Sequence, residues 1–335
     1  MNKMGWLRHI AVEGFIRFAY WSGLVNLFYC LNKGSKRIIM FHNVLPDKLF
    51  NKQHVSEFVS NSESEFRLII REVKKKFSIS NDLCDTSSAT LTFDDGYLNQ
   101  YECAKKILDE EGHLPAIIFV AGRLIGNRDP HNALIADLLM LWVSMVPDGI
   151  MPFRNGSRLW TWLKDLYPQM ENNEKSFGAD VLYSVNNIYP FQRIFAACDS
   201  EYLRLRFLGI TEEQIRELRS NGWVVGWHTK NHFPLSKLNL SVMEQEMTPP
   251  NNIYQTAVFA YPYGGTTQVD ARCVETASDL KYPCAVSAVP YYNQLSSKYF
   301  LPRMELRADK YRLHYELSGL RYFIMKRKLL PRIQI

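Results

Sequence analysis

The chain has 335 residues, which is enough for one large domain or two and for a sizeable buried core. Its 40 Lys and Arg residues only slightly outnumber its 34 Asp and Glu residues, and they form no dense basic block of the kind that binds nucleic acids. The six cysteines show no Cys-x-x-Cys motif and no paired spacing, which excludes a secreted disulfide scaffold. Composition therefore indicates an ordinary globular protein with reduced thiols, a pattern that favours the cytosol.

The first 32 residues contain an apolar stretch with helical spacing. Its longest uncharged run, residues 18–32, is shorter than the ~20 residues that a membrane-spanning helix needs, and no small-residue cleavage site follows it. On a helix, Glu13 and Arg17 would lie opposite an apolar side. That side comprises Leu7, Ala11, Phe15, Phe18, Val25 and Tyr29. We expect this amphipathic segment either to lie in a membrane interface or to pack on the rest of the protein.

Two predicted strands in the first hundred residues end in polar side chains. Residues 37–44 have the pattern of a buried strand that ends in His42. Residues 90–93 favour a strand that stops at Asp94 and Asp95. A turn at Gly96 can bend both carboxylates toward one pocket, where a cation would keep both ionised. An ordinary strand end with an Asp-Gly turn is the alternative interpretation.

A further strand is predicted over residues 115–120, and a long apolar segment follows it. Residues 126–209 are too many for a structureless loop in a compact domain. They include Leu138, Leu139, Trp142, Trp160 and Trp162. We expect several helices that form a cap or subdomain, with most of the tryptophans in its core.

Two candidate metal ligands follow a later predicted strand. After a helix over residues 210–218 and a strand over 223–227, His228 and His232 are four residues apart, in one helical turn or in a tight loop. Imidazoles at this spacing suit a single metal ion. Together with Asp95 they form a set of two histidines and one carboxylate, which suits Zn, Fe, Co or Mn.

The last two predicted features are a turn and a helix. A strand over residues 257–261 is broken by Pro262, and the turn at Tyr263 can present backbone N–H groups to a developing oxyanion, although an ordinary turn is equally compatible. Residues 311–328 predict a C-terminal helix that is weakened by Gly319, with His314 on its surface.

Taken in order, the motifs Thr92–Gly96, His228–His232 and Tyr261–Gly264 resemble those of the NodB-homology polysaccharide deacetylases, carbohydrate esterase family 4. The resemblance covers residues from about 36 to 307, apart from the middle. It implies an α/β fold, a distorted (β/α)7 barrel. It also implies roles for single residues: Asp95, His228 and His232 as metal ligands, Asp94 as the general base, and the backbone N–H of Tyr263 as an oxyanion donor.

Two residues of the family pattern have no counterpart at the expected positions, so other residues must take their roles. Ala260 stands where the third motif has an Arg that pairs with the catalytic Asp, and Arg303, from a later strand, is the candidate to supply that charge. The family's late catalytic His has no counterpart. His42 resembles the Tyr-His-x-Val opening of exopolysaccharide deacetylases, in which the general acid comes from the first strand, although a structural His at a strand end is the alternative.

The sequence therefore predicts a deacetylase domain over residues 33–310, interrupted by a helical insertion over 126–209. An amphipathic segment, 1–32, precedes it, and a basic helix, 311–335, follows it. In the middle of the chain the family normally needs only a short connection, so we expect the insertion to shape the substrate groove at the catalytic face.

The resemblance implies a metal-dependent hydrolase that removes acetyl groups from an N-acetylated sugar in a cell-surface polysaccharide or its biosynthetic intermediate. Zn is the expected ion, with Fe, Co, Ni or Mn as alternatives. The expected partners are an N-acetylated or lipid-linked glycan and a membrane touched by the terminal helices, but no nucleic acid. We expect a cytoplasmic protein, or one peripheral at the inner face of the membrane. A non-catalytic carbohydrate-binding or assembly protein, and an esterase or amidase for a non-sugar acyl group, are the alternatives.

Overall fold

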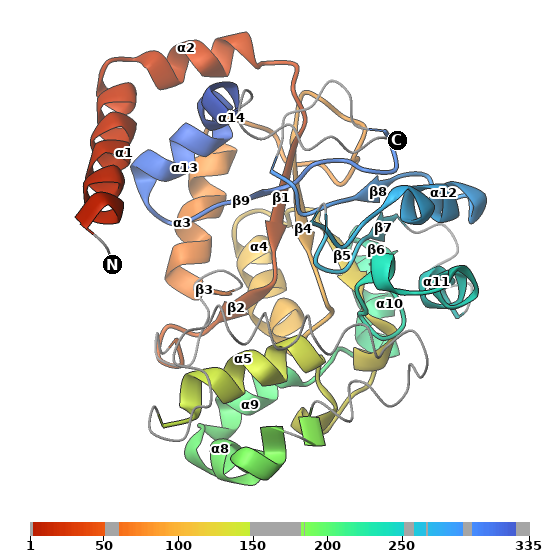
Figure 1. Cartoon of the computed structure of the whole chain (residues 1–335). Coiled ribbons are helices and arrows are strands. Elements are labelled where there is room, and N and C mark those ends of the chain that lie inside the picture. The colour runs from red at the N-terminus through yellow and green to blue at the C-terminus, as the bar shows by residue number, and fades with distance from the viewer. Residues whose placement is uncertain are drawn as a thin grey trace.

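A seven-stranded parallel sheet forms the centre of the molecule (Figure 1). The computed structural model describes residues 3–50, 60–147, 182–183, 185–250, 258–265, 267–290 and 297–325. The strand order in the sheet is β8-β7-β6-β5-β4-β1-β9. These strands are β1 (Arg37–Phe41), β4 (Ala89–Phe93), β5 (Ile117–Val120), β6 (Val224–Trp227), β7 (Phe259–Ala260), β8 (Ala285–Val286) and β9 (Met304–Glu305).

The strands are apolar along their whole length because both faces of the sheet are covered, as is usual for parallel sheets. Alternate residues separate into two cores. Ile38, Phe119 and Val286 pack together on the inner face of the curled sheet. Leu91 and Trp227 face the surrounding helices on the outer face.

The two edges of the sheet are joined by the segment that ends in β9. Leu301 forms a parallel bridge with Val286 of β8, and its N–H donates to the carbonyl oxygen of Ala285 (2.9 Å). Further along the same segment, Glu305 pairs with Met40 of β1 at the opposite edge. One short segment therefore binds both edges of the sheet, and the predicted distorted (β/α)7 barrel is confirmed.

Helices and a small second sheet surround the barrel. The helices are α3 (Glu63–Lys74), a π-helix (Gln100–Lys105) that continues into α4 (Lys106–Glu110), α10 (Glu212–Ser220), α11 (Leu240–Met247) and α12 (Ala271–Asp279). The second sheet pairs β2 (Asn43–Leu45) with β3 (Ser60–Ser62). Three short 3-10 helices lie at Gly122–Leu124, Pro130–Asn132 and Leu235–Lys237. The predicted helix over 210–218 begins at Glu212, because the Thr211 side chain accepts from the backbone N–H of Gln214 in a capping box.

The predicted insertion contains helices α5 (Ile135–Met145), α8 (Phe191–Ala197) and α9 (Ser200–Phe207) among its described residues. They lie at the opposite end of the molecule from α2 (Figure 1). Trp142 of α5 is fully buried and donates to the carbonyl oxygen of Tyr189 (3.0 Å). The other two tryptophans of the prediction, Trp160 and Trp162, lie outside the described residues.

The terminal segments form four helices instead of two. They are α1 (Lys3–Trp21), α2 (Leu24–Leu31), α13 (Lys310–Leu317) and α14 (Leu320–Met325). Gly23 and Gly319 both adopt φ near 80°, where residues with a side chain are disfavoured, and each ends the helical path at its position. The continuous helix predicted over 311–328 is therefore wrong. Within the part of the chain that the structure describes, no helix has the length and apolar character needed to cross a bilayer.

His314 is buried, so the prediction that it lies on a helix surface is wrong. Its Nδ1 atom lies 2.8 Å from the hydroxyl of Tyr29 on α2, and its Nε2 atom lies 3.1 Å from a carboxylate oxygen of Glu72 on α3. These contacts attach α2 and α13 to the barrel. The partners are far from His314 in sequence, so the local pattern of charges gave no sign of them.

Candidate metal and catalytic site

The acidic pair lies where β4 ends, as predicted. Asp95 and Gly96 both have positive φ values, 83° and 89°, so the chain turns sharply directly after Asp94. A side chain at position 96 would also meet the Val120 side chain at 2.8 Å. Gly96 thus satisfies both the backbone conformation and the close packing against β5. As a result, two successive carboxylates turn toward one buried site.

The two histidines lie on a tight loop after β6, which excludes the helical alternative. Thr229 and His232 have positive φ values, 64° and 60°, and the backbone N–H of His232 donates to the Thr229 hydroxyl (2.9 Å). Glu246 on α11 holds the same loop, because its carboxylate accepts from the backbone N–H of Asn231 (2.7 Å). These contacts fix a loop conformation that sequence periodicity does not reveal.

The loop brings His228 and His232 to Asp95. The Oδ1 atom of Asp95 lies 3.7 Å from Nε2 of His228 and 3.4 Å from Nε2 of His232. Three ligands at ~2.0–2.2 Å from a tetrahedral zinc ion would be separated by roughly 3.3–3.6 Å. The donor atoms of these residues all lie within 4.8 Å of one another, and the set is the one group of this kind found among the described residues. Its chemistry and its dimensions fit a divalent ion.

His228 is oriented as a metal ligand. Its Nδ1 atom lies 2.7 Å from the carbonyl oxygen of Ala260, so Nδ1 carries the proton and Nε2 turns toward Asp95 with its lone pair available. Burial lowers the pKa of His228 to about 4 and the pKa of His232 to about 3. Both imidazoles are therefore neutral at physiological pH, as metal coordination requires.

Asp95 is the candidate ligand whose charge most needs compensation. Burial, and after it the carboxylates of Asp137 and Asp94, raise the pKa of Asp95 well above its ordinary value. A buried carboxylate near other carboxylates ionises readily only when a cation lies beside it. The electrostatics of the site therefore favour a bound cation, in agreement with the spacing of the ligands.

Asp94 is held by Arg303 in a two-pronged ion pair. Nη1 and Nη2 of Arg303 each lie 2.6 Å from a different carboxylate oxygen of Asp94. Nε of Arg303 donates to the carbonyl oxygen of Ser287 (2.8 Å), so the guanidinium has little freedom. Burial alone would raise the pKa of Asp94, but the charge of Arg303 outweighs burial and holds that pKa below its usual range. Arg303 thus supplies the positive charge beside Asp94 that an alanine at position 260 cannot supply.

His42 and Tyr263 border the same site. The Nε2 atom of His42 is 4.0 Å from Oδ2 of Asp94, as is that of His228, and burial lowers the pKa of His42. The Tyr263 ring lies 4.8 Å from the ring of His232. Tyr263 has a φ of 60°, so the predicted turn after β7 is present beside the histidine loop. All seven residues that the sequence singled out are therefore brought together.

A buried ion pair from the insertion was not predicted. Arg206 on α9 donates to Asp137 on α5 (2.5 Å), and the hydroxyl of Tyr97 donates to the other oxygen of Asp137. All three side chains are buried. Tyr97 follows Asp95 by two residues, so this group connects the insertion to the acidic turn. Nothing in the local sequence distinguished Asp137 and Arg206 from ordinary surface charges.

Comparisons with known proteins agree with this geometry. A family model described as polysaccharide deacetylase matches residues 84–285, more than half of the chain. The match includes both acids and both histidines of the site, whereas His42 and Arg303 lie outside it. No curated protein matches the sequence.

Two solved structures are similar to this chain, and the first of them supports the similarity of fold. The Streptococcus pyogenes deacetylase PplD, in complex with acetate, shares 14% sequence identity, with a TM-score of 0.51 over 86% of this chain and 97% of that one. IcaB from Ammonifex degensii also shares 14% identity, with a TM-score of 0.49 over 85% of this chain and 96% of that one. At such identities the likeness concerns the fold alone, and the family rests on the sequence match. The chain belongs to the polysaccharide deacetylase family, whose members are enzymes that remove acetyl groups.

Proposed function

We propose that this deacetylase depends on a divalent metal ion and acts on an N-acetylated sugar of a cell-surface polysaccharide or of its biosynthetic intermediate. The observation that supports this most directly is the cluster of Asp95, His228 and His232 beside an ionised Asp94. The family accounts for removal of acetyl groups from a polysaccharide. The dependence on a metal ion and the N-acetylated sugar are the parts of the proposal that go beyond the family.

In this proposal Asp95, His228 and His232 hold the ion, which is Zn or alternatively Fe, Co, Ni or Mn. When bound, such an ion supplies Lewis-acid chemistry, because it lowers the pKa of a water molecule and polarises the acetyl carbonyl. The remaining catalytic roles are filled by side chains and backbone groups of this chain. The backbone N–H of Tyr263 is our candidate for stabilising the oxyanion of the tetrahedral intermediate.

Asp94 and His42 divide the proton transfers. Asp94 takes a proton from the attacking water, whose oxygen forms a bond to the carbonyl carbon. The C–N bond breaks as the amine nitrogen receives a proton, and the amine leaves together with acetic acid, which loses its remaining proton to the solvent as acetate. Because burial lowers the pKa of His42, its imidazole is neutral before the reaction. His42 must therefore gain a proton before it can act as the acid. We propose that this proton comes from Asp94, whose Oδ2 atom lies 4.0 Å from Nε2 of His42, and that His42 then delivers it to the amine.

Arg303 keeps Asp94 ionised and in position for this transfer. Its contact with both carboxylate oxygens leaves each oxygen a second lone pair. Asp94 therefore starts the cycle as a carboxylate and gives the proton up again readily, which suits a relay from water to His42.

For the substrate, we propose a lipid-linked or nucleotide-linked glycan handled on the cytoplasmic side. The cysteines support this location: all six are free, and Cys103, Cys273 and Cys284 are buried where burial raises the pKa of each thiol to about 12. Such thiols are poorly reactive and act as small apolar residues.

The test is acetate release from a panel of N-acetylated glycans, N-acetylated sugar nucleotides and a non-sugar acetate ester, with metal content measured in parallel. We expect the zinc-loaded protein to release acetate from an N-acetylated sugar. Asp94→Asn should abolish release but retain the metal, and His42→Ala should reduce turnover with metal content unchanged. Release from the ester alone would favour the non-sugar alternative, and no release from any N-acetylated compound would favour a binding protein. Loss of metal in His42→Ala would show that the role of His42 is assigned wrongly.

A further inference from the structure

Exposed apolar side chains gather on the terminal helices. Twelve large apolar residues are exposed among those described, and eight of them lie on α1, α2 and α14. We call these eight the terminal patch: Val12, Phe15, Phe18 and Trp21 on α1, Leu27 and Leu31 on α2, and Phe323 and Ile324 on α14. Phe18, Trp21, Leu31 and Phe323 are between 65% and 75% exposed. A helix on the surface of a soluble domain normally turns polar residues outward, so this face is suited to a partner.

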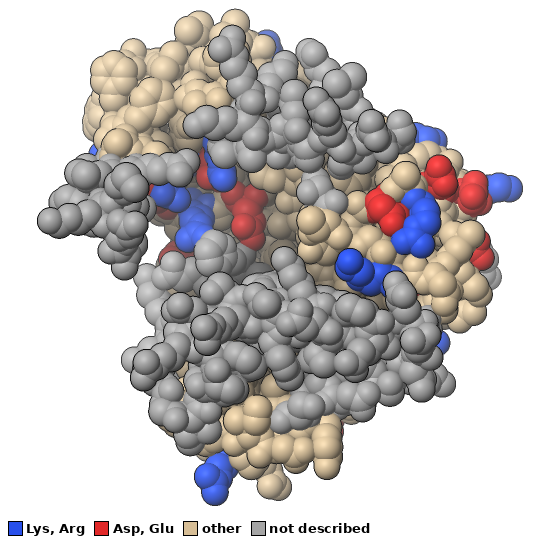
Figure 2. Space-filling model, viewed as in Figure 1, with Lys and Arg blue, Asp and Glu red and all other residues tan. Residues whose placement is uncertain are grey.

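The three helices form one surface because their inner sides share a core. Ile16, Ala19, Val25, Phe28 and Leu320 are buried together between α1, α2 and α14. The rings of Phe28 and Phe323 lie 5.1 Å apart, which joins α2 to α14 directly. In the view of Figure 2 the tan surface at the upper left, over α2 and the second half of α1, is mostly without charged side chains. Since the inner faces are already filled, the outer apolar side chains have no interior site to occupy.

Polar contacts hold these helices firmly on the barrel. Asn32 donates to the carbonyl oxygen of Ser318 (2.8 Å), and Arg37 donates to that of Leu317 (3.1 Å). Arg312 on α13 is paired with Glu13 on α1 (3.0 Å). The terminal patch is therefore a fixed surface of the folded protein.

The charge of the terminal segments identifies the partner. Residues 1–36 and 310–335 contain 12 Lys and Arg but only two acidic residues, whereas the rest of the chain contains 28 and 32. Both acidic residues are paired, Glu13 with Arg312 and Glu316 with Arg321. The ends of the chain are thus strongly basic, whereas the protein as a whole has a net charge of +6. A second copy docked on the same patch would bring two such positive ends together, which opposes self-association.

We propose that the terminal patch is a membrane-binding surface that inserts its apolar side chains among the headgroups of an anionic bilayer. Aromatic and aliphatic side chains with flanking Lys and Arg are the combination by which helices bind in the plane of a membrane interface. The sequence continues beyond α14 with Lys326, Arg327 and Lys328, which are among the basic residues counted for this end of the chain. The assignment rests on the terminal helices alone and does not depend on the reaction proposed above.

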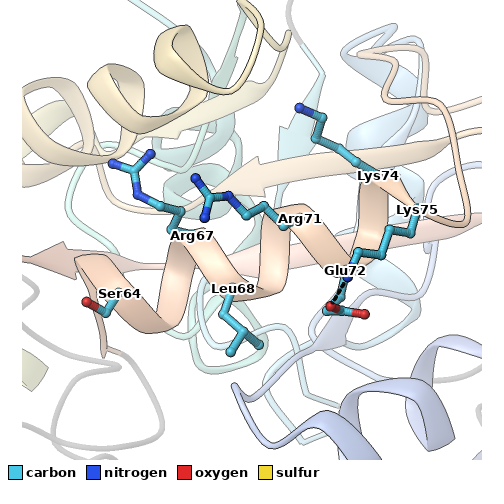
Figure 3. A pocket seen from close by; sticks show the side chains of 7 residues that line it. All are labelled: Ser64, Arg67, Leu68, Arg71, Glu72, Lys74 and Lys75. Atoms are coloured by element: carbon cyan, nitrogen blue, oxygen red, sulfur yellow. Dashed lines mark hydrogen bonds and ion pairs between the residues drawn. The ribbon is translucent and has the colours of Figure 1, made fainter.

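A basic pocket along α3, about 600 Å3 in volume, is a poorer candidate for anionic headgroups (Figure 3). Its basic side chains already have acidic partners. Arg67 is paired with Glu110, Arg71 and Lys74 with Glu111, and Lys75 with Glu72. The pocket therefore offers much less uncompensated charge than the terminal segments.

The test is co-sedimentation of the full chain with vesicles of equimolar phosphatidylcholine and phosphatidylglycerol, and with vesicles of phosphatidylcholine alone. We expect binding to the anionic vesicles that weakens as salt is added. Replacing Phe18→Gln and Leu31→Gln together should lower the partition coefficient at least about tenfold, because two inserted side chains become polar. The matched control is Leu240→Gln on α11, which changes a 52% exposed leucine outside the terminal patch and should leave binding unchanged.

A fluorescence measurement covers the case in which the double variant folds poorly. Anionic vesicles should shift tryptophan emission of the unaltered protein to shorter wavelengths, and Trp21→Phe should remove most of the shift. Absence of vesicle binding by the unaltered protein, or equal binding by the double variant, would overturn the assignment. It would also be overturned if sedimentation velocity revealed self-association that the double variant abolishes, since a second copy would then occupy the patch.

Discussion

The geometry of Asp94 depends on one distant side chain, Arg303. The guanidinium meets both carboxylate oxygens at 2.6 Å, and its remaining donors are directed to Thr92 and Ser287. A lysine would retain the charge, but its single ammonium group cannot reproduce a planar fork. Arg303 therefore fixes the direction of the carboxylate as well as its ionisation.

We predict that Arg303→Lys reduces kcat by roughly 10–100-fold, the range typical of residues that orient a reacting group. Zinc content should stay unchanged, because Arg303 does not touch a ligand of the cluster. The measurement is steady-state acetate release together with metal analysis. Arg272→Lys is the matched control, because Arg272 forms a comparable pair with Asp270 that is largely exposed. Unaltered kcat in Arg303→Lys would mean that the fork contributes only to packing.

Glu305 on β9 gives a prediction about pH. Burial raises the pKa of Glu305 to about 7, above its ordinary value, and Arg307 offsets the shift only in part. The folded state therefore binds this proton more tightly than the unfolded state does. Protonated Glu305 therefore contributes to the stability of the folded state. This contribution is fully present below about pH 4.5 and is lost as the pH rises toward 7.

Glu305→Gln should remove this dependence. At pH 8 the variant should be more stable relative to the unaltered protein than it is at pH 5, by on the order of 2 kcal/mol in the free energy of unfolding. This is less than the full pKa shift implies, because Glu305 is partly exposed. Urea unfolding at the two pH values measures the difference. Glu316 lies nearby, and burial raises its pKa as well, so Glu316→Gln separates the two contributions. Equal pH dependence in Glu305→Gln and the unaltered protein would refute the assignment.

Among the elements, strands were predicted more reliably than helices. The ends of β4 and β6 follow from short apolar runs that stop at Asp94 and His228, a signal contained in adjacent residues. The terminal helices were predicted as continuous, whereas Gly23 and Gly319 adopt left-handed conformations, with φ of 81° and 82°, that interrupt them. Contacts over long separations, such as those of Asp137 with Arg206, leave no local pattern at all.

The insertion is attached to the acidic turn through helices α5 and α9. Asp137 accepts from both Arg206 and Tyr97, whereas Nη1 of Arg206 has no hydrogen-bond partner within the described part of the chain. Removing one member of a buried ion pair leaves the other charge uncompensated, which is costlier than replacing both. The pair is thus expected to specify how the insertion docks on the barrel.

We predict that Arg206→Met lowers the free energy of unfolding by about 3–5 kcal/mol. Combining it with Asp137→Asn should restore at least half of that loss, because no buried charge is then left alone. Chemical denaturation of both single variants and the double variant measures the coupling. Arg216→Met, which breaks an exposed pair with Glu212, is the control and should change stability by less than about 0.5 kcal/mol. Additive effects of the two substitutions would contradict the prediction.

At the scale of the whole molecule, the parallel sheet explains why residues from four motifs meet. The carboxyl ends of parallel strands lie at one edge of a barrel, and loops that leave them converge there. His42 follows β1, Asp94 and Asp95 follow β4, and His228 follows β6. The order of motifs along the chain was therefore enough to predict the cluster. The contribution of β9 was harder to foresee, because Arg303 and Asp94 are 209 residues apart in sequence and meet only through the pairing of β9 with β1.

If the proposed cluster holds a metal ion, the same arrangement makes that binding a property of the folded chain. The ligands come from β4 and from the loop after β6, more than a hundred residues apart, so the unfolded chain does not present them together. A ligand that binds only the folded state stabilises it by about 2.7 kcal/mol when its concentration is a hundred times the dissociation constant. For a chain of this size we expect zinc to raise the Tm by roughly 4 °C and a chelator to reverse the change.

Substitutions in the cluster connect this stabilisation to the site. His232→Ala should abolish the zinc-dependent rise in Tm, since it removes one of three ligands. His113→Ala is the matched control, because His113 is 87% exposed and belongs to no cluster, and its rise should equal that of the unaltered protein. Thermal melting in metal-free buffer and in added zinc measures both variants without any assay of activity. If His232→Ala kept the full rise, zinc would be binding elsewhere, and the three side chains would be held together by hydrogen bonds alone.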